Sequence, residues 1–185
     1  VPAYLAANFT NLRDATELPL DRKELGGALP RELGLLTKLK RLWLDHNELT
    51  GPVPGELGAC LRLEELWLHA NKLQGELPEA LFRGGSALKH CYLFRNRLAG
   101  DVPASVGHLK QLQKLYLQDN RLRSVPPAIC GCAELRALDL HANRMSRALA
   151  TAEFAEGLRP LRKLRTLDVR GNRVNEEKLP AALAR

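Results

Sequence analysis

A motif of about 24 residues recurs along the chain, and this repetition constrains the fold more than any other feature. Each copy follows the pattern Leu-x-x-Leu-x-Leu-x-x-Asn, with small variations. The copies begin at residues 15, 39, 63, 88, 112, 135 and 164, so the steps between them are 24, 24, 25, 24, 23 and 29 residues. The first copy is degenerate and has Lys23 where the others have Asn. Repetition at this period predicts stacked similar units rather than one globular core.

The centre of each copy has the alternation of a short β-strand. In the second copy, Leu42 and Leu44 are two residues apart and therefore point to one face, whereas Trp43 points to the other. A single unit cannot bury its leucines, but stacked units can. We therefore expect parallel strands about 4.8 Å apart, with one leucine-lined face and one outward face.

The residues after each strand predict a turn and a return segment. The Asn of the motif is expected to satisfy backbone groups that the turn leaves unpaired. Residues 49–54, 73–78 and 98–103 read Leu-x-Gly-x-x-Pro, where Gly permits a bend and Pro excludes the interior of a helix. The fifth copy lacks this Gly. The sixth copy is long, and residues 146–163 predict a helix whose possible inward residues are Leu149, Ala152, Phe154 and Leu158.

These motifs resemble those of leucine-rich repeat proteins, and the Leu-x-Gly-x-x-Pro segments are similar to the plant-type subclass, mixed with shorter and longer copies. The resemblance implies an α/β, right-handed solenoid with a concave parallel β-sheet and with loops and short helices on the convex side. We expect one domain, with an N-terminal cap at 1–14 and seven repeats plus a partial eighth over 15–183. Further chain or a partner would cover the C-terminal end, unless the last half-turn is itself the cap.

The outward strand positions carry a column of aromatic side chains in the second to fifth copies. Trp and Tyr dominate the energetics of protein interfaces, and an exposed aromatic patch usually marks a partner. Phe94 flanks this column in the next outward position, and the column changes to aspartates in the last two copies. The predicted protein-binding surface is centred on Trp43, Trp67, Tyr92, Phe94 and Tyr116, with a polar rim of His69, His90, Arg95, Asp139 and Asp168.

A purely structural role for the column is the alternative. Adjacent rings can stack on one another and stabilise the sheet by about 0.5–1.5 kcal/mol per pair. The sequence Glu17, Arg41, Glu65 in the preceding outward column likewise predicts cross-strand charge pairs. We favour an interface because the aromatics end at Asp139, whereas stacking alone gives no reason for that limit.

The sequence predicts neither an enzyme nor a metal or cofactor site. It contains none of the usual nucleophile, phosphate-loop, zinc-protease or kinase motifs. Asp139 and Asp168 lie next to each other, but on an open face that suits an interface rim better than acid–base chemistry. His69 and His141 share a column but are three strands apart, about 14 Å, and His90 belongs to another column.

Charge and hydropathy limit the partners. The formal net charge is +7, with ten Lys and Arg against five Asp and Glu from residue 144 to 185. Because no nucleic-acid motif accompanies this excess, we expect a solvated basic surface and no nucleic-acid partner. No apolar run approaches the 18 residues typical of a membrane span, so none is expected.

The cysteines favour a reducing compartment. Cys60, Cys91 and Cys132 occupy inward positions and are expected to act as small core residues, and Cys130 occupies a position often held by Gly. Extracellular proteins of the plant-type subclass usually have cysteine pairs in their caps, but residues 1–14 and 174–185 contain no Cys. An intracellular, cytoplasmic location follows as an expectation, although Asn8-Phe9-Thr10 is a glycosylation sequon.

The function expected from these observations is non-catalytic protein recognition. The chain would be a scaffold or a subunit of an assembly, up to a large one, and would bind a protein partner on its concave face. Two alternatives remain open: the ectodomain of a ligand-sensing receptor, and the recognition arm of a larger enzyme complex.

Overall fold

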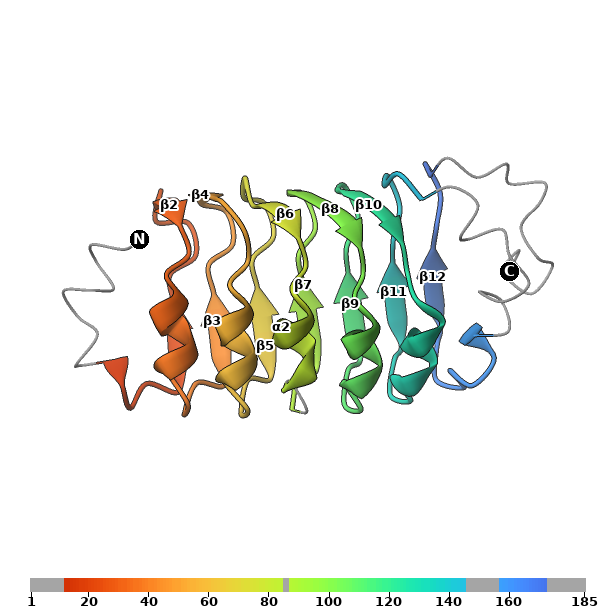
Figure 1. Ribbon diagram of the computed structural model, residues 1–185, viewed down its shortest axis with the longest axis horizontal. Coiled ribbons are helices and arrows are strands. Elements are labelled where there is room, and N and C mark those ends of the chain that lie inside the picture. The colour runs from red at the N-terminus through yellow and green to blue at the C-terminus, as the bar shows by residue number, and fades with distance from the viewer. Residues whose placement is uncertain (1–11, 85–86, 146–156, 173–185) are drawn as a thin grey trace.

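A seven-stranded parallel sheet forms one side of the molecule (Figure 1). The computed structural model describes residues 12–84, 87–145 and 157–172. Each strand begins two residues after a repeat start predicted from the sequence, because the alternating segment follows the first Leu of the motif. In their order across the sheet, the strands are β1 (Glu17–Pro19), β3 (Arg41–Trp43), β5 (Glu65–Trp67), β7 (His90–Tyr92), β9 (Lys114–Tyr116), β11 (Ala137–Asp139) and β12 (Thr166–Asp168).

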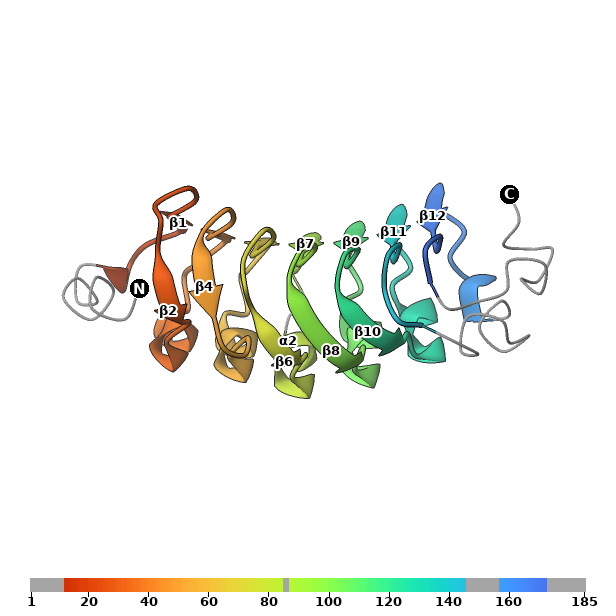
Figure 2. The same cartoon turned by 90° about the horizontal axis from the view of Figure 1, so that it is seen from above.

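Short helices lie on the opposite side of the sheet, and the whole described chain forms a shallow arc with the sheet on its inner side (Figure 2). Of the five helices that lie wholly within the described residues, four are 3-10 helices and one is a single α-helical turn, and each follows a Pro in extended conformation. The expected solenoid, with a concave parallel sheet and a helical convex side, is therefore confirmed. The helices are η1 (Arg31–Leu35), η2 (Gly55–Ala59), α2 (Glu79–Arg83), η3 (Ala104–His108) and η4 (Pro127–Gly131).

Two small parallel sheets run along the edge where the chain turns from the concave to the convex side. In most copies the expected Gly provides the bend, as at Gly51, which has φ +73°. The fifth copy, which lacks this Gly, has a register shift between Leu122 and Ser124 instead. The strands of these sheets are β2 (Gly26–Ala28) and β4 (Glu48–Thr50), and β6 (Gln74–Glu76), β8 (Arg97–Asp101) and β10 (Arg121–Ser124).

The core is a continuous column of inward side chains that runs the length of the solenoid. Leu42, Leu66, Cys91, Leu115 and Leu138 occupy the same position in successive strands and are all fully buried. Burying each of the Leu side chains stabilises the fold by about 1.5–3 kcal/mol. Because every repeat buries its leucines against the next one, the strands keep one register across the sheet.

The Asn ladder has the structural role that the sequence predicts. Asn71 Oδ1 accepts a hydrogen bond from the Leu49 backbone N at 3.0 Å, and its Nδ2 donates to the carbonyls of Leu44 and Leu68 at 2.9 and 3.1 Å. Two of these groups belong to the preceding repeat, so the amide connects consecutive turns. The same pattern occurs at Asn47, Asn96, Asn120, Asn143 and Asn172.

Several expectations fall wholly or mainly outside the described residues. These are the cap at 1–14, the helix within 146–163 and the partial eighth repeat, so the domain boundaries stay a prediction. Within the part of the chain that is described, no helix has the length and apolarity needed to cross a membrane.

Candidate functional site

The aromatic column forms one row of rings on the concave face. Parallel pairing places Trp43 beside Trp67, Trp67 beside Tyr92, and Tyr92 beside Tyr116. The successive ring centroids are 5.2, 5.5 and 5.0 Å apart, and the two tyrosine rings are stacked with 14° between their planes. All four side chains are half-buried. Stacking between neighbours is therefore real, and each ring also keeps part of its surface open to a partner.

The polar atoms of these rings differ in their partners. Trp43 Nε1 donates to Glu65 Oε2 at 3.1 Å, which holds that indole against β5. The buried Nε1 of Trp67 has no acceptor among the described residues. Burial raises the pKa of the Tyr92 hydroxyl to about 12, so this ring stays neutral and remains a hydrogen-bond donor at neutral pH.

The second outward column is more deeply packed than the sequence suggests. The ring of His69 stacks on Phe94, with centroids 4.3 Å apart and 18° between the planes, and only 9% of His69 is exposed. The sequence predicted His69 in an exposed polar rim. The structure instead places it in the floor of the concave face. Phe94 is half-buried and lies in the next repeat.

The other predicted rim residues have partners of their own. His90 lies parallel to the ring of Tyr92, with centroids 6.0 Å apart, and burial lowers its pKa below the ordinary 6.5. The exposed Arg95 lies 3.8 Å from Asp119 Oδ2. These contacts hold both side chains beside the aromatic column, where they can border a bound partner.

Asp139 and Asp168 are paired across β11 and β12, and each carboxylate has a different polar partner. Asp139 Oδ1 accepts hydrogen bonds from the backbone N of His141 and lies 2.9 Å from its Nδ1. Asp168 binds the guanidinium of Arg170, and this hydrogen bond lowers the pKa of the carboxyl group. Both carboxylates thus have polar partners of their own, which suits a polar border.

The expected charge pairing in the first outward column occurs in part. Arg41 forms an ion pair with Glu17, and its Nε donates to Glu17 Oε1 at 3.0 Å. Glu65, the other expected partner, instead accepts the indole hydrogen bond of Trp43. Glu17 therefore compensates the charge of Arg41, whereas Glu65 orients the indole ring of Trp43.

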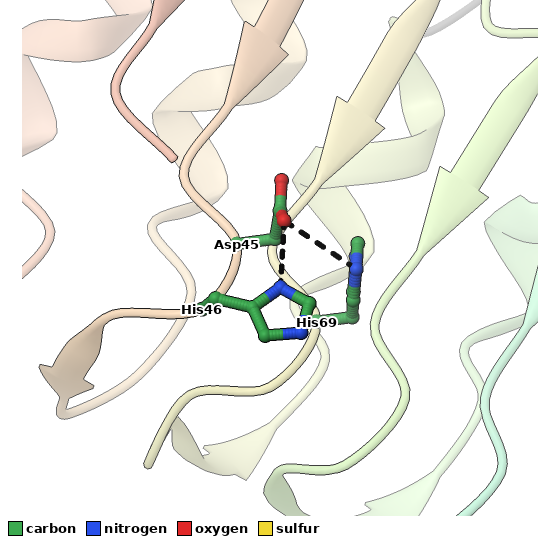
Figure 3. Close-up of side chains that lie close together, drawn as sticks. All are labelled: Asp45, His46 and His69. Carbon is green, nitrogen blue, oxygen red and sulfur yellow. Dashed lines mark hydrogen bonds and ion pairs between the residues drawn. The ribbon is translucent and has the colours of Figure 1, made fainter. Parts of the chain in front are cut away.

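A cluster of Asp45, His46 and His69, which was not predicted from the sequence, lies just after the ends of β3 and β5 (Figure 3). Asp45 Oδ2 is 2.9 Å from His46 Nδ1 and 3.5 Å from His69 Nε2. Burial is the main cause that lowers the pKa of His69 from 6.5, so its imidazole is neutral at neutral pH. The usable signal was the Asp-His-Asn sequence at 45–47 with a His one repeat later in the position of Asp45.

The cysteines are placed as the sequence predicts. Cys60, Cys91 and Cys132 are buried and all four cysteines are free thiols. Burial raises the pKa of Cys60 to about 11 and the pKa of Cys91 and Cys132 to about 12. These three side chains are core residues without nucleophilic character.

Comparison with known families gives a consistent match. One sequence model described as Leucine rich repeat matches residues 62–122 and 87–145, and a second matches residues 38–60. Together these matches cover more than half of the chain. A comparison with curated protein sequences gave no significant match.

Solved structures of plant proteins are similar over most of this chain. The plant peptide hormone receptor RGFR1, solved in complex with RGF2, has a TM-score of 0.81 and 28% identity, over 89% of this chain and 26% of the receptor chain. The ectodomain of the receptor kinase GASSHO1/SCHENGEN3 from Arabidopsis thaliana, in complex with CASPARIAN STRIP INTEGRITY FACTOR 2, has a TM-score of 0.81 and 32% identity, over 91% and 20%. A plant ice-binding protein has a TM-score of 0.74 and 28% identity, over 91% and 54%.

These comparisons correct the expected location of the protein. The expected intracellular location is contradicted, because the similar receptor structures include the ectodomain of a plant membrane receptor kinase. The absence of cysteines near the ends of the given chain was a poor guide, since this chain spans about a quarter or less of those receptor chains.

Proposed function

The chain belongs to the leucine-rich repeat family, and we propose that it is a protein-recognition segment of an extracellular, receptor-type array. Its ligand is a peptide or an extended loop of a protein, bound on the concave face. The contact centres on Trp43, Trp67, Tyr92, Phe94 and Tyr116, bordered by His90, Arg95, Asp139 and Asp168.

The row of half-buried aromatic rings is the observation that carries this proposal. Centroid distances of 5.0–5.5 Å continue without a break across four strands. An extended peptide rises about 3.3 Å per residue, so the row can contact roughly five ligand residues. Rings that already stack on one another lose little conformational freedom on binding, which favours affinity.

The edges of the row support recognition of a segment rather than of a flat surface. At one end Pro19 replaces the aromatic ring, and at the other end Asp139 and Asp168 continue the column as carboxylates. A bound segment would therefore place apolar side chains against the rings and polar groups at the aspartate end. The similar plant peptide hormone receptor RGFR1, solved in complex with RGF2, agrees with this class of ligand.

Peptide selection on the immobilised chain tests the proposal. Random displayed peptides are selected for binding, and the affinity of each selected peptide is then measured by calorimetry for the unmodified chain and for Trp67→Ala and Tyr116→Ala. We expect each substitution to weaken binding by about 2 kcal/mol or more, as at other aromatic hot spots.

Leu61→Ala provides the matched control, because Leu61 is a large apolar side chain that is 59% exposed, next to η2 on the convex side. This variant should retain the affinity of the unmodified chain. Selected peptides that bind all three variants equally well would refute the concave site. Circular dichroism of each variant separates loss of binding from loss of fold.

A further inference from the structure

Three potential metal ligands converge beside the aromatic row. One ligand atom each from Asp45, His46 and His69 lies within 4.8 Å of the other two. Figure 3 shows both imidazole rings turned toward the same carboxylate oxygen of Asp45. The three residues come from two repeats, so the parallel register of β3 and β5 brings them together.

A turn, rather than the strand, brings His46 to this position. Successive side chains of a strand point to opposite faces, so Asp45 and His46 would normally diverge. His46 has φ +53°, in the left-handed region, which ends this alternation, and its Nδ1 lies beside Asp45 Oδ2. His69 is fixed from the other side by its stacking on Phe94.

The carboxylate of Asp45 lacks a compensating positive charge. Asp45 is only 6% exposed, and its buried Oδ1 has no hydrogen-bond partner in the described part of the chain. No Lys or Arg forms an ion pair with Asp45 among the residues described; only the two imidazoles approach it. Burying an ionised carboxylate is costly unless a cation or several donors compensate it.

We propose that Asp45, His46 and His69 form a binding site for a divalent transition-metal ion, with the ligand set that suits Zn²⁺. Two imidazole nitrogens and one carboxylate oxygen are a common three-residue zinc set, with the fourth position left to water or to a ligand atom. Ligands 2.0–2.1 Å from a tetrahedral ion are about 3.3 Å apart. The separations of 2.9 and 3.5 Å between Asp45 Oδ2 and the nitrogens of His46 and His69 bracket this value, and all three ligand atoms lie within 4.8 Å of one another.

A second carboxylate–histidine cluster among the described residues already has a compensating positive charge. Asp139, His141 and Asp168 also lie within 4.8 Å of one another. There, however, Arg170 Nη2 lies 2.6 Å from Asp168 Oδ2, so a guanidinium already supplies the positive charge. This difference singles out the cluster at β3 and β5.

Two arginines in the neighbouring repeats lower the affinity of this site for a metal ion. Arg22 and Arg95 lie at the His46 position of the repeats on either side, and their charges disfavour a cation. Both side chains are exposed, and Arg95 lies 3.8 Å from Asp119, so solvent and this carboxylate screen much of the effect.

Zinc binding to the full chain tests the proposal. The chain is freed of metal with a chelator, and Zn²⁺ alone is titrated by calorimetry in a buffer that does not bind metal. We expect one tight site per chain, and X-ray absorption of the zinc complex should show nitrogen and oxygen ligands at about 2.0–2.1 Å. Binding should also raise the thermal unfolding temperature, because only the folded chain assembles the site.

For two test substitutions, another repeat of this chain already has the substituting residue at the same position. His46→Ala creates the residue found at position 70, which has the same φ of 53° one repeat later. His69→Phe creates the residue found at Phe94 in the same column of the next repeat. Each should weaken zinc binding on the order of ten-fold or more, since removing even an outer-shell partner of a ligand has this effect. His108→Ala, on the exposed end of η3, is the control and should bind as the unmodified chain does.

The outcomes are separable. Loss of tight binding in both cluster variants, with a normal His108→Ala variant, supports the site. The proposal is overturned if the double variant His46→Ala/His69→Phe binds zinc as well as the unmodified chain. It is also overturned if His141→Ala alone removes binding, because the ion would then lie in the other cluster. Cooperative unfolding of each variant, followed by circular dichroism, shows that the fold is intact.

Discussion

Replacing Asn120 with Ala should destabilise the solenoid at the junction of two repeats. Asn120 is buried, and its Oδ1 accepts a hydrogen bond from the Leu98 backbone N at 3.0 Å. Its Nδ2 donates to the carbonyls of Leu93 at 3.0 Å and of Leu117 at 3.1 Å. The substitution removes these hydrogen bonds and a third, longer one from Nδ2 to the Gln118 carbonyl at 3.3 Å, and leaves an apolar methyl group in their place.

The expected loss follows from the groups left without partners. A typical hydrogen bond contributes about 0.5–1.5 kcal/mol net, and a buried group left unsatisfied costs about 1–3 kcal/mol. The Leu98 amide bears most of this cost, because each carbonyl has a second lone pair and is less costly to leave with one partner fewer. We expect the free energy of unfolding to fall by roughly 2–4 kcal/mol.

Urea denaturation followed by circular dichroism measures this loss, and hydrogen exchange at the Leu98 amide localises it. The control is Arg121→Ala, which changes an exposed neighbour and should alter stability by less than about 0.5 kcal/mol. Exchange at Leu98 should accelerate more in Asn120→Ala than the global loss accounts for. An Asn120→Ala variant as stable as the control, with unchanged Leu98 protection, would refute the assigned role of the ladder.

Three further outcomes can be checked on the same protein. Gly58→Ala should cost about 1–3 kcal/mol in urea denaturation, because the new Cβ would lie 1.9 Å from a backbone oxygen of α2; unchanged stability would contradict this packing. With an aromatic disulfide reagent, the native chain should react first at the half-buried Cys130, while Cys91 should react only on unfolding; equal rates would be inconsistent with the burial described. Because burial lowers the pKa of His90 below 6.5, the unfolded chain binds its proton at higher pH than the folded chain does. The free energy of unfolding should therefore decrease as the pH falls through 6.5, less so in His90→Gln, and an NMR titration of His90 with an ordinary pKa would rule out this effect.

The repeat units and their register could be predicted from the sequence because both depend on local patterns. Alternation with a period of two decides which side chain of each strand faces the core, and a one-residue error would expose Leu42 and Leu66 together. The Asn positions were equally predictable, since an amide at a turn has few roles besides satisfying the backbone. The aromatic row follows directly from this register.

The details of the concave face required the tertiary structure. The burial of His69 against Phe94 and the binding of Arg170 to Asp168 depend on side-chain conformations that the repeat pattern does not specify. The expected location was wrong because the chain is similar to the structure of a plant receptor ectodomain, which the cysteine positions did not indicate.

The cluster of Asp45, His46 and His69 shows most clearly what the sequence determines and what the tertiary structure decides. The sequence by itself determined that Asp45 and His69 occupy one outward column on adjacent strands, because the strand register follows from the spacing of the leucines. Only the tertiary structure decided that His46 joins them, because its left-handed φ of +53° reverses the alternation at the end of β3. In the other repeats, Gly occupies the position of His46 only at Gly171, so the residue types do not reveal the left-handed conformation. The stacking of one turn on the next imposes it.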